Sequence, residues 1–474
     1  MENAGTINAA TTVPTDKKGG SEAQYISLYQ EAGQLITAHS CPTMNALRDQ
    51  AFEDFQRLGF PSKKVERYKY TDMQRLFAPD YGVNLKRLTI PADPYKAFSC
   101  DVPNLSTLLY FVVNDVFYSN LKSQISNLKP KAVIIDSLTK HPDIVAMHYG
   151  QLAKTGEDAV TALNTMLAQD GLLVYVPKGV KVERTVQVIN ILKSPFASTY
   201  AKGAGGTPFM VNRRVLIVLE EGAELKMLFC DHTADDLDFL TTQVIEASVG
   251  KNARMELYCM EETHNKNTRI SNVYIDQQRN SHVVHNVITL HNGCTRNKLD
   301  LALSGEGAAC ECYGCVIADK HQHVDNNTLI THHATHCSSH ELYKYVLDEQ
   351  ATGAFAGRVL VEPGAQQTES QMTNQNLCAS REARMYTQPM LEIYADDVKC
   401  AHGSTVGQLN DQALFYMRQR GIPENEARTL LQVAFINQVI DKIALAPLRE
   451  RLHYLVEKRF RGELNKCEGC KLCK

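Results

Sequence analysis

Signatures of membrane insertion, secretion and nucleic-acid binding are absent from this sequence. It contains no run of about 18 apolar residues, so no membrane-spanning helix is expected. The first twenty residues lack the apolar segment of a secretory signal, which predicts a cytoplasmic chain whose thiols stay reduced. The formal net charge of −3 argues against a dedicated nucleic-acid binder, because such proteins are usually basic.

Motifs for nucleotide binding and for several hydrolytic mechanisms are also missing. The chain has neither the phosphate loop G-x-x-x-x-G-K-[ST] nor the dinucleotide fingerprint G-x-G-x-x-G. The run Gly203-Ala204-Gly205-Gly206 is too short to replace them. Neither a nucleophile elbow nor the zinc motif H-E-x-x-H occurs. We therefore expect no nucleotide bound by this chain, and any ATP that its function requires would be bound by another subunit.

Cysteine and histidine, in contrast, are numerous. The 474 residues include 14 cysteines and 16 histidines, within an ordinary composition of 44% hydrophobic and 22% charged residues. The length is enough for two or three domains, or for one long domain with extensions. Because disulfides are rare in a reducing compartment, clustered cysteines indicate metal or sulfur chemistry rather than a disulfide framework.

The first third of the chain has mixed character. Residues 1–20 have no periodicity and are expected to be disordered. Residues 21–168 form a largely helical region. Apolar stripes at helical spacing predict two helices before the aromatic, basic stretch PSKKVERYKYTDMQRLF (residues 61–77), and one more at Glu157–Leu167. A strand is expected at Leu105–Val116.

Residues 169–406 form the predicted β core. They contain short alternating or apolar runs, such as VQVINIL and RMELYCM, with almost no helical periodicity. Many short strands without helices indicate a sandwich, a propeller or a stacked β-solenoid. A solenoid is favoured over a sandwich because related short sequences recur at the expected corners. The open ends of a solenoid would need a cap or would pair with another chain. The corners are Glu221-Gly222-Ala223, Glu306-Gly307-Ala308 and Pro363-Gly364-Ala365.

Helical periodicity returns in residues 407–464. A first helix ends at Gly421, and a second, at about residues 424–444, carries apolar side chains around more than one face. The second helix therefore belongs either to a small helical subdomain or to a groove for a partner protein. Residues 465–474 form a cysteine-rich tail.

The stretch IYADDVKCAHGSTVG, residues 393–407, carries the first candidate site. Cys400 and His402 are two residues apart next to a strand-like run, and residues i and i+2 of a strand project from one face. The thiol and the imidazole would then point together, as a pair that shares a metal, a sulfur or a proton. The alternative is a buried thiol that packs as a small hydrophobe beside a hydrogen-bonded histidine.

The tail carries a second candidate, Cys467-x-x-Cys470-x-x-Cys473. Its spacing resembles part of an iron–sulfur or zinc ligand set, although a fourth ligand is not obvious. Neighbouring lysines would lower the thiol pKa values and raise reactivity. The alternative is a flexible tail that binds metal adventitiously.

Two further clusters are weaker candidates. The run Cys310-x-Cys312-x-x-Cys315 would place its first two thiols on one strand face, but it lacks a second pair. A histidine-rich run could bind zinc or iron, or it could lie on the solvated face of stacked strands. Its members are His321, His323, His332, His333, His336, Cys337 and His340.

Several stretches together resemble the SufB/SufD family of iron–sulfur cluster assembly proteins of the SUF system. The resemblance is strong from about Gly171 to Phe460. It is carried by GLLVYVPKGVKVE, DNNTLITHHATHCSSHELYKYVL, GAFAGRVLVEPGAQQTESQMTNQNL and IYADDVKCAHGSTVGQLNDQALFYMRQRGI. The segment ERYKYTDMQRLF resembles the family's N-terminal region more loosely. The residues after His402, Gly403-Ser404-Thr405-Val406-Gly407, have the SufD form rather than the Glu-Ala-Thr-Thr-Ser of SufB.

This resemblance implies a mostly β fold, with a right-handed parallel β-helix core flanked by N-terminal and C-terminal helical regions. It also implies a non-catalytic scaffold subunit that pairs with SufB through the β-helices and binds the ATPase SufC through its C-terminal helices, with a sulfur donor system acting indirectly. The family's Cys-x-His pair maps onto Cys400 and His402, at an interface where a nascent iron–sulfur cluster is shared with SufB. The tail cysteines are not part of this pattern.

Two other functions are compatible with parts of the sequence. One is a SufB-like primary cluster scaffold that needs no separate partner. The other is a β-helix enzyme that acts on polysaccharides, against which the missing signal peptide and the thiol content argue.

Overall fold

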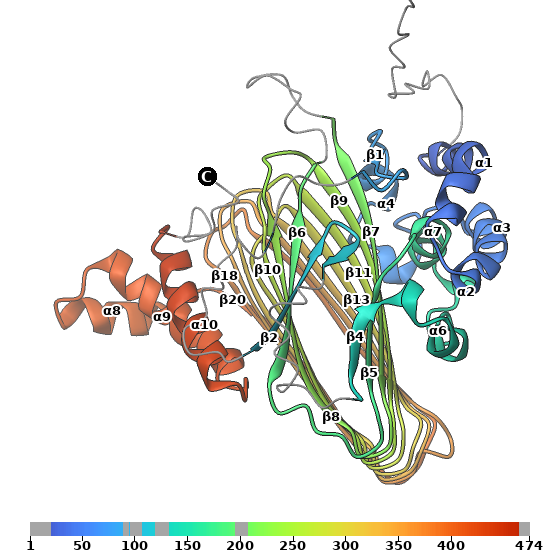
Figure 1. Cartoon of the computed structure of the whole chain (residues 1–474). Coiled ribbons are helices and arrows are strands. Elements are labelled where there is room, and N and C mark those ends of the chain that lie inside the picture. Colours follow the sequence, from blue (N-terminus) through green and yellow to red (C-terminus); the bar gives the residue numbers. More distant parts are fainter. Residues whose placement is uncertain (1–19, 89–93, 95–106, 119–131, 195–206, 464–474) are drawn as a thin grey trace, which may run out of the picture.

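The computed structural model of the chain describes residues 20–88, 94, 107–118, 132–194 and 207–463. Its core is a parallel β-solenoid of about seven turns, in which successive strands alternate between two facing sheets (Figure 1). The prediction of a mostly β solenoid with flanking helices is confirmed; its right hand stays a prediction. The expected disorder of residues 1–20 and the tail at 465–474 fall, Gly20 aside, outside the described residues.

Sheet one contains the odd-numbered strands from β5 to β19, together with β4 and β1. From the last coil to the first, its order is β19-β17-β15-β13-β11-β9-β7-β5-β4, and β1 pairs with β7. The strands are β1 (Gly82–Val83), β4 (Ile134–Ser137), β5 (Leu172–Val176), β7 (Phe209–Leu219), β9 (Phe239–Val249), β11 (Asn267–Gln277), β13 (Cys294–Leu303), β15 (His323–His332), β17 (Thr352–Val361) and β19 (Arg384–Ile393).

Sheet two contains the even-numbered strands from β6 to β20, together with β2 and β3, in the order β20-β18-β16-β14-β12-β10-β8-β6-β2-β3. They are β2 (Thr107–Val113), β3 (Val116–Tyr118), β6 (Thr185–Leu192), β8 (Glu224–Thr233), β10 (Arg254–Glu262), β12 (His282–His291), β14 (Ala309–Ala318), β16 (Ser338–Leu347), β18 (Thr368–Cys378) and β20 (Val398–Gly407). Thus β2 and β4, from the mixed region of residues 21–168, extend both sheets at the first coil.

The corners that lead from sheet one to sheet two keep successive coils in register. Gly222 and Gly307 adopt φ +69°, where a side chain would be strained, and this explains two of the three Gly-Ala corners. Their N–H groups donate to the next coil, to Lys251 O at 2.8 Å and to Thr335 O at 3.1 Å. His336, also at positive φ, repeats the arrangement one coil further on. Backbone hydrogen bonds at the corners therefore hold successive coils in register independently of side-chain contacts.

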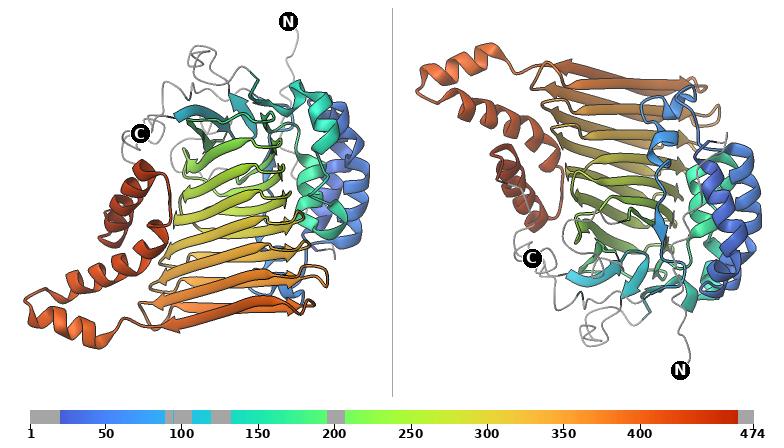
Figure 2. Two further views of the ribbon diagram at one scale, coloured as in Figure 1. Left: turned by 90° about the horizontal axis from the view of Figure 1, so that it is seen from below. Right: turned by 90° about the horizontal axis from the view of Figure 1, so that it is seen from above.

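Helices cover the outer face of sheet one (Figures 1 and 2). They are α1 (Glu22–Ala38), α2 (Pro42–Ala46), α3 (Arg48–Leu58), α4 (Met73–Leu76), α6 (Pro142–His148) and α7 (Ala159–Leu167), with short 3-10 turns at Glu66–Tyr68, Leu138–Lys140 and Thr155–Glu157. Every residue of α7 is buried, because this helix lies between the sheet and the outer helices.

The aromatic, basic stretch, residues 61–77, connects the N-terminal helices to the later coils of the solenoid. Arg67 forms an ion pair with Asp300 of β13 at 2.6 Å. The ring of Tyr70 stacks on Tyr386 of β19, with centroids 4.9 Å apart. The stretch therefore reaches the last coil of the solenoid from the N-terminal side.

Three helices follow the last strand. They are α8 (Asp411–Gln419), α9 (Glu424–Ile440) and α10 (Ala446–Phe460). Buried side chains of α9 and α10 pack on the outer face of sheet two, on the side of the solenoid opposite to the N-terminal helices, whereas α8 projects away from it (Figure 2). None of the helices in the described part of the chain is long and apolar enough to cross a membrane.

A buried ionic cluster joins α7 to sheet one. Lys298 of β13, whose side chain is 5% exposed, lies 3.2 Å from Asp158 and donates to the hydroxyl of Tyr274 at 3.0 Å. Asp158 caps α7 by accepting from Thr161 N at 2.9 Å. Burial alone would raise the pKa of Asp158, but Lys298 and a hydrogen bond from Tyr68 hold it below its usual value. The carboxylate is therefore charged and depends on its lysine.

We expect Lys298→Met to lower the free energy of unfolding by about 3–5 kcal/mol, because it leaves the buried Asp158 without its cation. The matched control is Lys226→Met, which removes a cation from a partly exposed pair with Glu256 and should cost less than about 1 kcal/mol. Urea denaturation followed by circular dichroism measures both. Equal losses in the two variants would contradict the assignment.

Candidate functional site

Cys400 and His402 lie on β20, the last strand of sheet two. In the parallel register with β18, Cys400 is opposite Ser370 and His402 is opposite Met372. Ser370 and Met372 are 3% and 0% exposed, in a strand whose alternate residues face the interior. Residues opposite each other in a sheet share a face, so the thiol and the imidazole project on the interior side, between the two sheets. The sequence prediction that they share a strand face agrees with this geometry.

The last coil leaves this interior open at one end. Among the described strands, β19 and β20 each have a neighbour in their own sheet on one side only. Thr387 of β19 and Ser404 of β20 form a hydrogen bond between their hydroxyls at 2.9 Å, which joins the two sheets at this end. Cys400 is half-buried against the interior core and His402 is exposed. The pair therefore lies at the mouth of the solenoid interior.

The thiol of Cys400 is held in its protonated form. Burial raises its pKa above the usual value, and a hydrogen bond with the backbone at Ser370 opposes this only in part. A thiolate is the form that binds metals, so Cys400 would lose its proton when a metal ion or cluster approaches.

Two interior rows of side chains lead from this pair into the solenoid. His402 continues the row Met372, Glu341, Cys312 and His285, whose members lie opposite one another in successive strands. The second row runs from Cys400 through Ser370 and Ser339 to Cys310.

Contacts along the second row are partly hydrogen-bonded. Ser339 donates to the hydroxyl of Ser370 at 2.8 Å, and the Nε2 atom of His332 lies 2.9 Å from Ser339 Oγ. Burial lowers the pKa of His332 to about 4, so this histidine is neutral. The interior next to the candidate pair therefore contains buried polar groups that are hydrogen-bonded to one another.

The run Cys310-x-Cys312-x-x-Cys315 is divided between the two faces of β14. Cys310 and Cys312 share one strand face, as predicted, and this face is turned to the interior. A hydrogen bond between their side chains together with burial raises the pKa of Cys312. Cys315 lies on the outer face, in the cluster formed with α9 and α10. The three thiols therefore do not form one ligand set.

The histidine-rich run is dispersed as well. His332 faces the interior, and His323 contacts Thr71 on the outer face of sheet one. His340 stacks edge-on against Tyr313 of sheet two. His321, His333 and His336 occupy turns, and His333 lies 2.9 Å from Glu362. In the part of the chain that the structure describes, no three His, Cys, Asp or Glu side chains are grouped as a metal site.

The tail candidate, Cys467, Cys470 and Cys473, lies outside the described residues. The interior neighbours Ser370, Met372 and Glu341 were not found by sequence analysis. The signal that could have found them is the coil repeat, because residues of the His402 row are 27–31 positions apart.

Comparison with known proteins agrees with this architecture. The family description "SUF system FeS cluster assembly, SufBD core domain" matches residues 200–435, and "SufBD protein N-terminal region" matches residues 19–188. The two matches together cover most of the chain. The protein therefore belongs to the SufBD family of the SUF system, a family of iron–sulfur cluster assembly.

Relatives that match most of the chain are described as iron–sulfur cluster assembly proteins. An iron–sulfur cluster assembly SufBD family protein of Synechocystis is 29% identical over 85% of this chain and 88% of its own length. The iron–sulfur cluster assembly protein SufD of Bacillus subtilis is 26% identical over 87% of this chain and 93% of its own. SufD of Escherichia coli is 24% identical over 87% of this chain and 92% of its own.

The interior row predicts a measurable pH dependence of stability. Burial raises the pKa of Glu341 to about 7, above the value of an unfolded glutamate. The folded state therefore binds this proton more tightly, and the stability it contributes is lost as the pH rises from about 4.5 to about 7. We expect Glu341→Gln to remove this loss, on the order of 2–3 kcal/mol at pH 8 relative to pH 5.

Urea denaturation at several pH values measures the effect, with Glu362→Gln, an exposed carboxylate in a turn, as the matched control. Glu261, whose pKa burial also raises to about 7, leaves a residual slope in every variant. An unchanged pH profile for Glu341→Gln would contradict the assignment.

Proposed function

We propose that this chain is a non-catalytic scaffold subunit on which iron and sulfide are assembled into a cluster, together with SufB and the ATPase SufC. The observation that supports this most directly is the position of Cys400 and His402 at the open last coil of the solenoid. Two donors are too few for an iron–sulfur cluster, which binds four protein ligands. The remaining ligands would come from another chain that closes this end.

The edges of β19 and β20 suit such a partner. An unpaired strand edge offers a row of N–H and C=O groups to an incoming strand, and both sheets present such an edge at the same end. β20 is ten residues long and most of it is exposed. A SufB subunit that continued the two sheets would place its own side chains directly against Cys400 and His402.

In this proposal iron and sulfide are the cargo, and the chain's own residues supply ligands and environment. Cys400 would lose its proton to solvent and bind iron through sulfur, and His402 would bind through an imidazole nitrogen. Behind them Met372 and Ser370 are buried, so bulk water would be excluded from the interior side of the forming cluster. No nucleotide is bound by this chain.

The C-terminal helices offer a second docking surface. Phe415 and Tyr416 of α8 are 62% and 56% exposed, and Leu430 of α9 is 39% exposed. Helix α8 projects away from the solenoid (Figure 2). Large exposed apolar side chains that lie close together mark protein interaction sites. We assign this surface to SufC, so that ATP hydrolysis by SufC would move the helices that pack on sheet two.

The first test is the double variant Cys400→Ala/His402→Ala. Co-expressed with SufB and SufC and reconstituted anaerobically with iron and sulfide, it should copurify normally but form clusters at least about tenfold less well, because ligands are lost. Iron and acid-labile sulfide per complex are the measurements. The matched control is Cys378→Ala/His333→Ala, a half-buried thiol and an exposed histidine away from the mouth. Unchanged cluster formation in the first variant would refute the role of the pair.

The second test is Phe415→Ala/Tyr416→Ala. Both side chains are exposed, so the fold should be unaffected, whereas affinity for SufC should fall at least about tenfold if they are central contacts. Isothermal titration calorimetry with purified SufC measures this. The control is Val65→Ala/Met147→Ala, two exposed apolar residues on the N-terminal side of the solenoid. Equal affinities for the two variants would rule out the α8 surface.

A further inference from the structure

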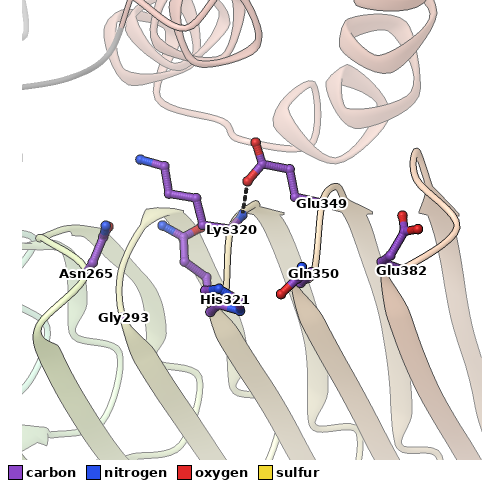
Figure 3. A pocket seen from close by; sticks show the side chains of 8 residues that line it. Asn265, Gly293, Lys320, His321, Glu349, Gln350 and Glu382 are labelled. Carbon is purple, nitrogen blue, oxygen red and sulfur yellow. Dashed lines mark hydrogen bonds between the residues drawn. The ribbon is translucent and has the colours of Figure 1, made fainter.

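Polar side chains at the two edges of the solenoid differ in their exposure. The corners that lead from sheet two back to sheet one form an open pocket of about 640 Å³ (Figure 3). Lys320 and Glu349 in its wall are exposed, and the N–H of Lys320 donates to Glu349 at 3.0 Å. At the opposite edge, where the chain passes from sheet one to sheet two, His332, Ser339 and Ser370 are 0%, 4% and 3% exposed. Burial of these three polar groups costs stability unless each finds a hydrogen-bond partner.

The interior row that contains the two serines becomes polar toward Cys400. In successive strands of sheet two, the residues opposite one another are Leu225, Met255, Val283, Cys310, Ser339, Ser370 and Cys400. The first three are buried and apolar, as expected for an interior. His332 lies between Leu303 and Val361 in its own row of sheet one. Along the sheet-two row, hydroxyl groups therefore occur only in the two strands directly before Cys400.

The hydrogen bonds among these polar groups have one direction. Ser339 uses its hydroxyl hydrogen toward Ser370 Oγ, at 2.8 Å. The Nε2 atom of His332, 2.9 Å from Ser339 Oγ, therefore donates, because a hydroxyl has a single hydrogen. Burial lowers the pKa of His332 to about 4, so the ring is neutral and carries its one hydrogen on Nε2. The donors thus run from His332 through Ser339 to Ser370.

The last hydroxyl of this chain lies beside the sulfur of Cys400. Ser370 accepts from Ser339, and its own hydroxyl hydrogen has no acceptor among the described residues. Cys400 is directly opposite in the next strand, where the spacing of a parallel ladder is about 4.8 Å. The thiol of Cys400 already has a hydrogen bond with the backbone at Ser370. Rotation about one side-chain bond of Ser370 therefore brings its hydroxyl hydrogen to the sulfur.

We propose that Ser370 donates its hydroxyl hydrogen to the sulfur of Cys400 when that sulfur binds iron, and that Ser339 and His332 are positioning residues that orient this donor. The inference rests on the function proposed above, because it needs Cys400 as a ligand. The hydrogen stays bonded to Ser370, so no proton or electron is transferred. Hydrogen bonds to the sulfurs help to set the reduction potential of an iron–sulfur cluster, and outer partners of this kind hold ligands in position.

The first experiment compares Ser370→Ala with Ser370→Thr in the complex co-expressed with SufB and SufC and loaded with a cluster. Loss of the hydroxyl should lower the reduction potential, because a donor to sulfur stabilises the more negative, reduced cluster. At a fixed potential near the midpoint, the ratio of reduced to oxidised cluster should fall about threefold or more in Ser370→Ala. Ser370→Thr, which keeps a hydroxyl, should restore the ratio. Electron paramagnetic resonance of the poised samples measures it.

The control is Ser271→Ala. It removes a buried interior hydroxyl of β11, which accepts from Gln243 Nε2 at 3.2 Å, and it should leave the ratio unchanged. An unchanged ratio in Ser370→Ala, in a complex that loses its clusters in Cys400→Ala/His402→Ala, would refute the role of Ser370 and leave the proposed function standing. Normal clusters in Cys400→Ala/His402→Ala would refute both. A shift of equal size in the control would mark a general effect of packing and would also refute the role of Ser370.

The second experiment needs no cluster. In the chain alone, with ¹⁵N-labelled histidines, His332 should give the nitrogen shifts of the neutral Nε2–H tautomer, and His332→Phe identifies its signals by their loss. Ser339→Ala removes the acceptor and should move these signals, whereas Ser271→Ala should not. In the loaded complex His332→Phe should lower the ratio of reduced to oxidised cluster, as Ser370→Ala does. Thermal unfolding shows that the variants are folded. A ring that carries its hydrogen on Nδ1 would reverse the direction of the donors and overturn the proposal.

Discussion

The backbone ladder between successive coils is the constraint on which the rest of this structure depends. Each interior strand pairs in parallel with the strand one coil before and the strand one coil after it, and left-handed corners such as Gly222 and Gly307 hold the register. Because the register is fixed, side chains 27–31 residues apart form continuous rows. The candidate site is the last member of two such rows, so its surroundings are set by the ladder rather than by its neighbours in sequence.

Much of the fold could be read from local patterns. The alternation of apolar and polar residues predicted the strands. The recurring Gly-Ala pairs marked corners that the structure contains at Gly222 and Gly307. The i, i+2 spacing predicted that Cys400 and His402 share one strand face. These features depend on a few adjacent residues. Which residues meet across coils could not be read, because coil lengths vary by several residues and a shift of one residue turns every side chain to the other face.

The same reasoning explains why the histidine-rich run looked like a site. Side chains alternate between the two faces of a strand, so His332 faces the interior and His323 the outer face of the same strand. His336 lies in a corner between strands. Composition detects seven donors in twenty residues but not the faces on which they lie. The ion pair of Lys298 and Asp158, in contrast, was missed by sequence analysis. Its two residues are 140 positions apart, so no local pattern connects them.

The two ends of the solenoid differ in kind. At the first coil β3 and β4 are short and run antiparallel to their neighbours, whereas at the last coil two strands of ten residues present parallel edges. A stack that adds molecules at both ends would grow into a fibre, as open β edges tend to do. Among the strands that the structure describes, only those of the last coil present two long parallel edges, so a contact between two such ends would leave no further edge of this kind for growth. This asymmetry would favour a finite pair over a fibre.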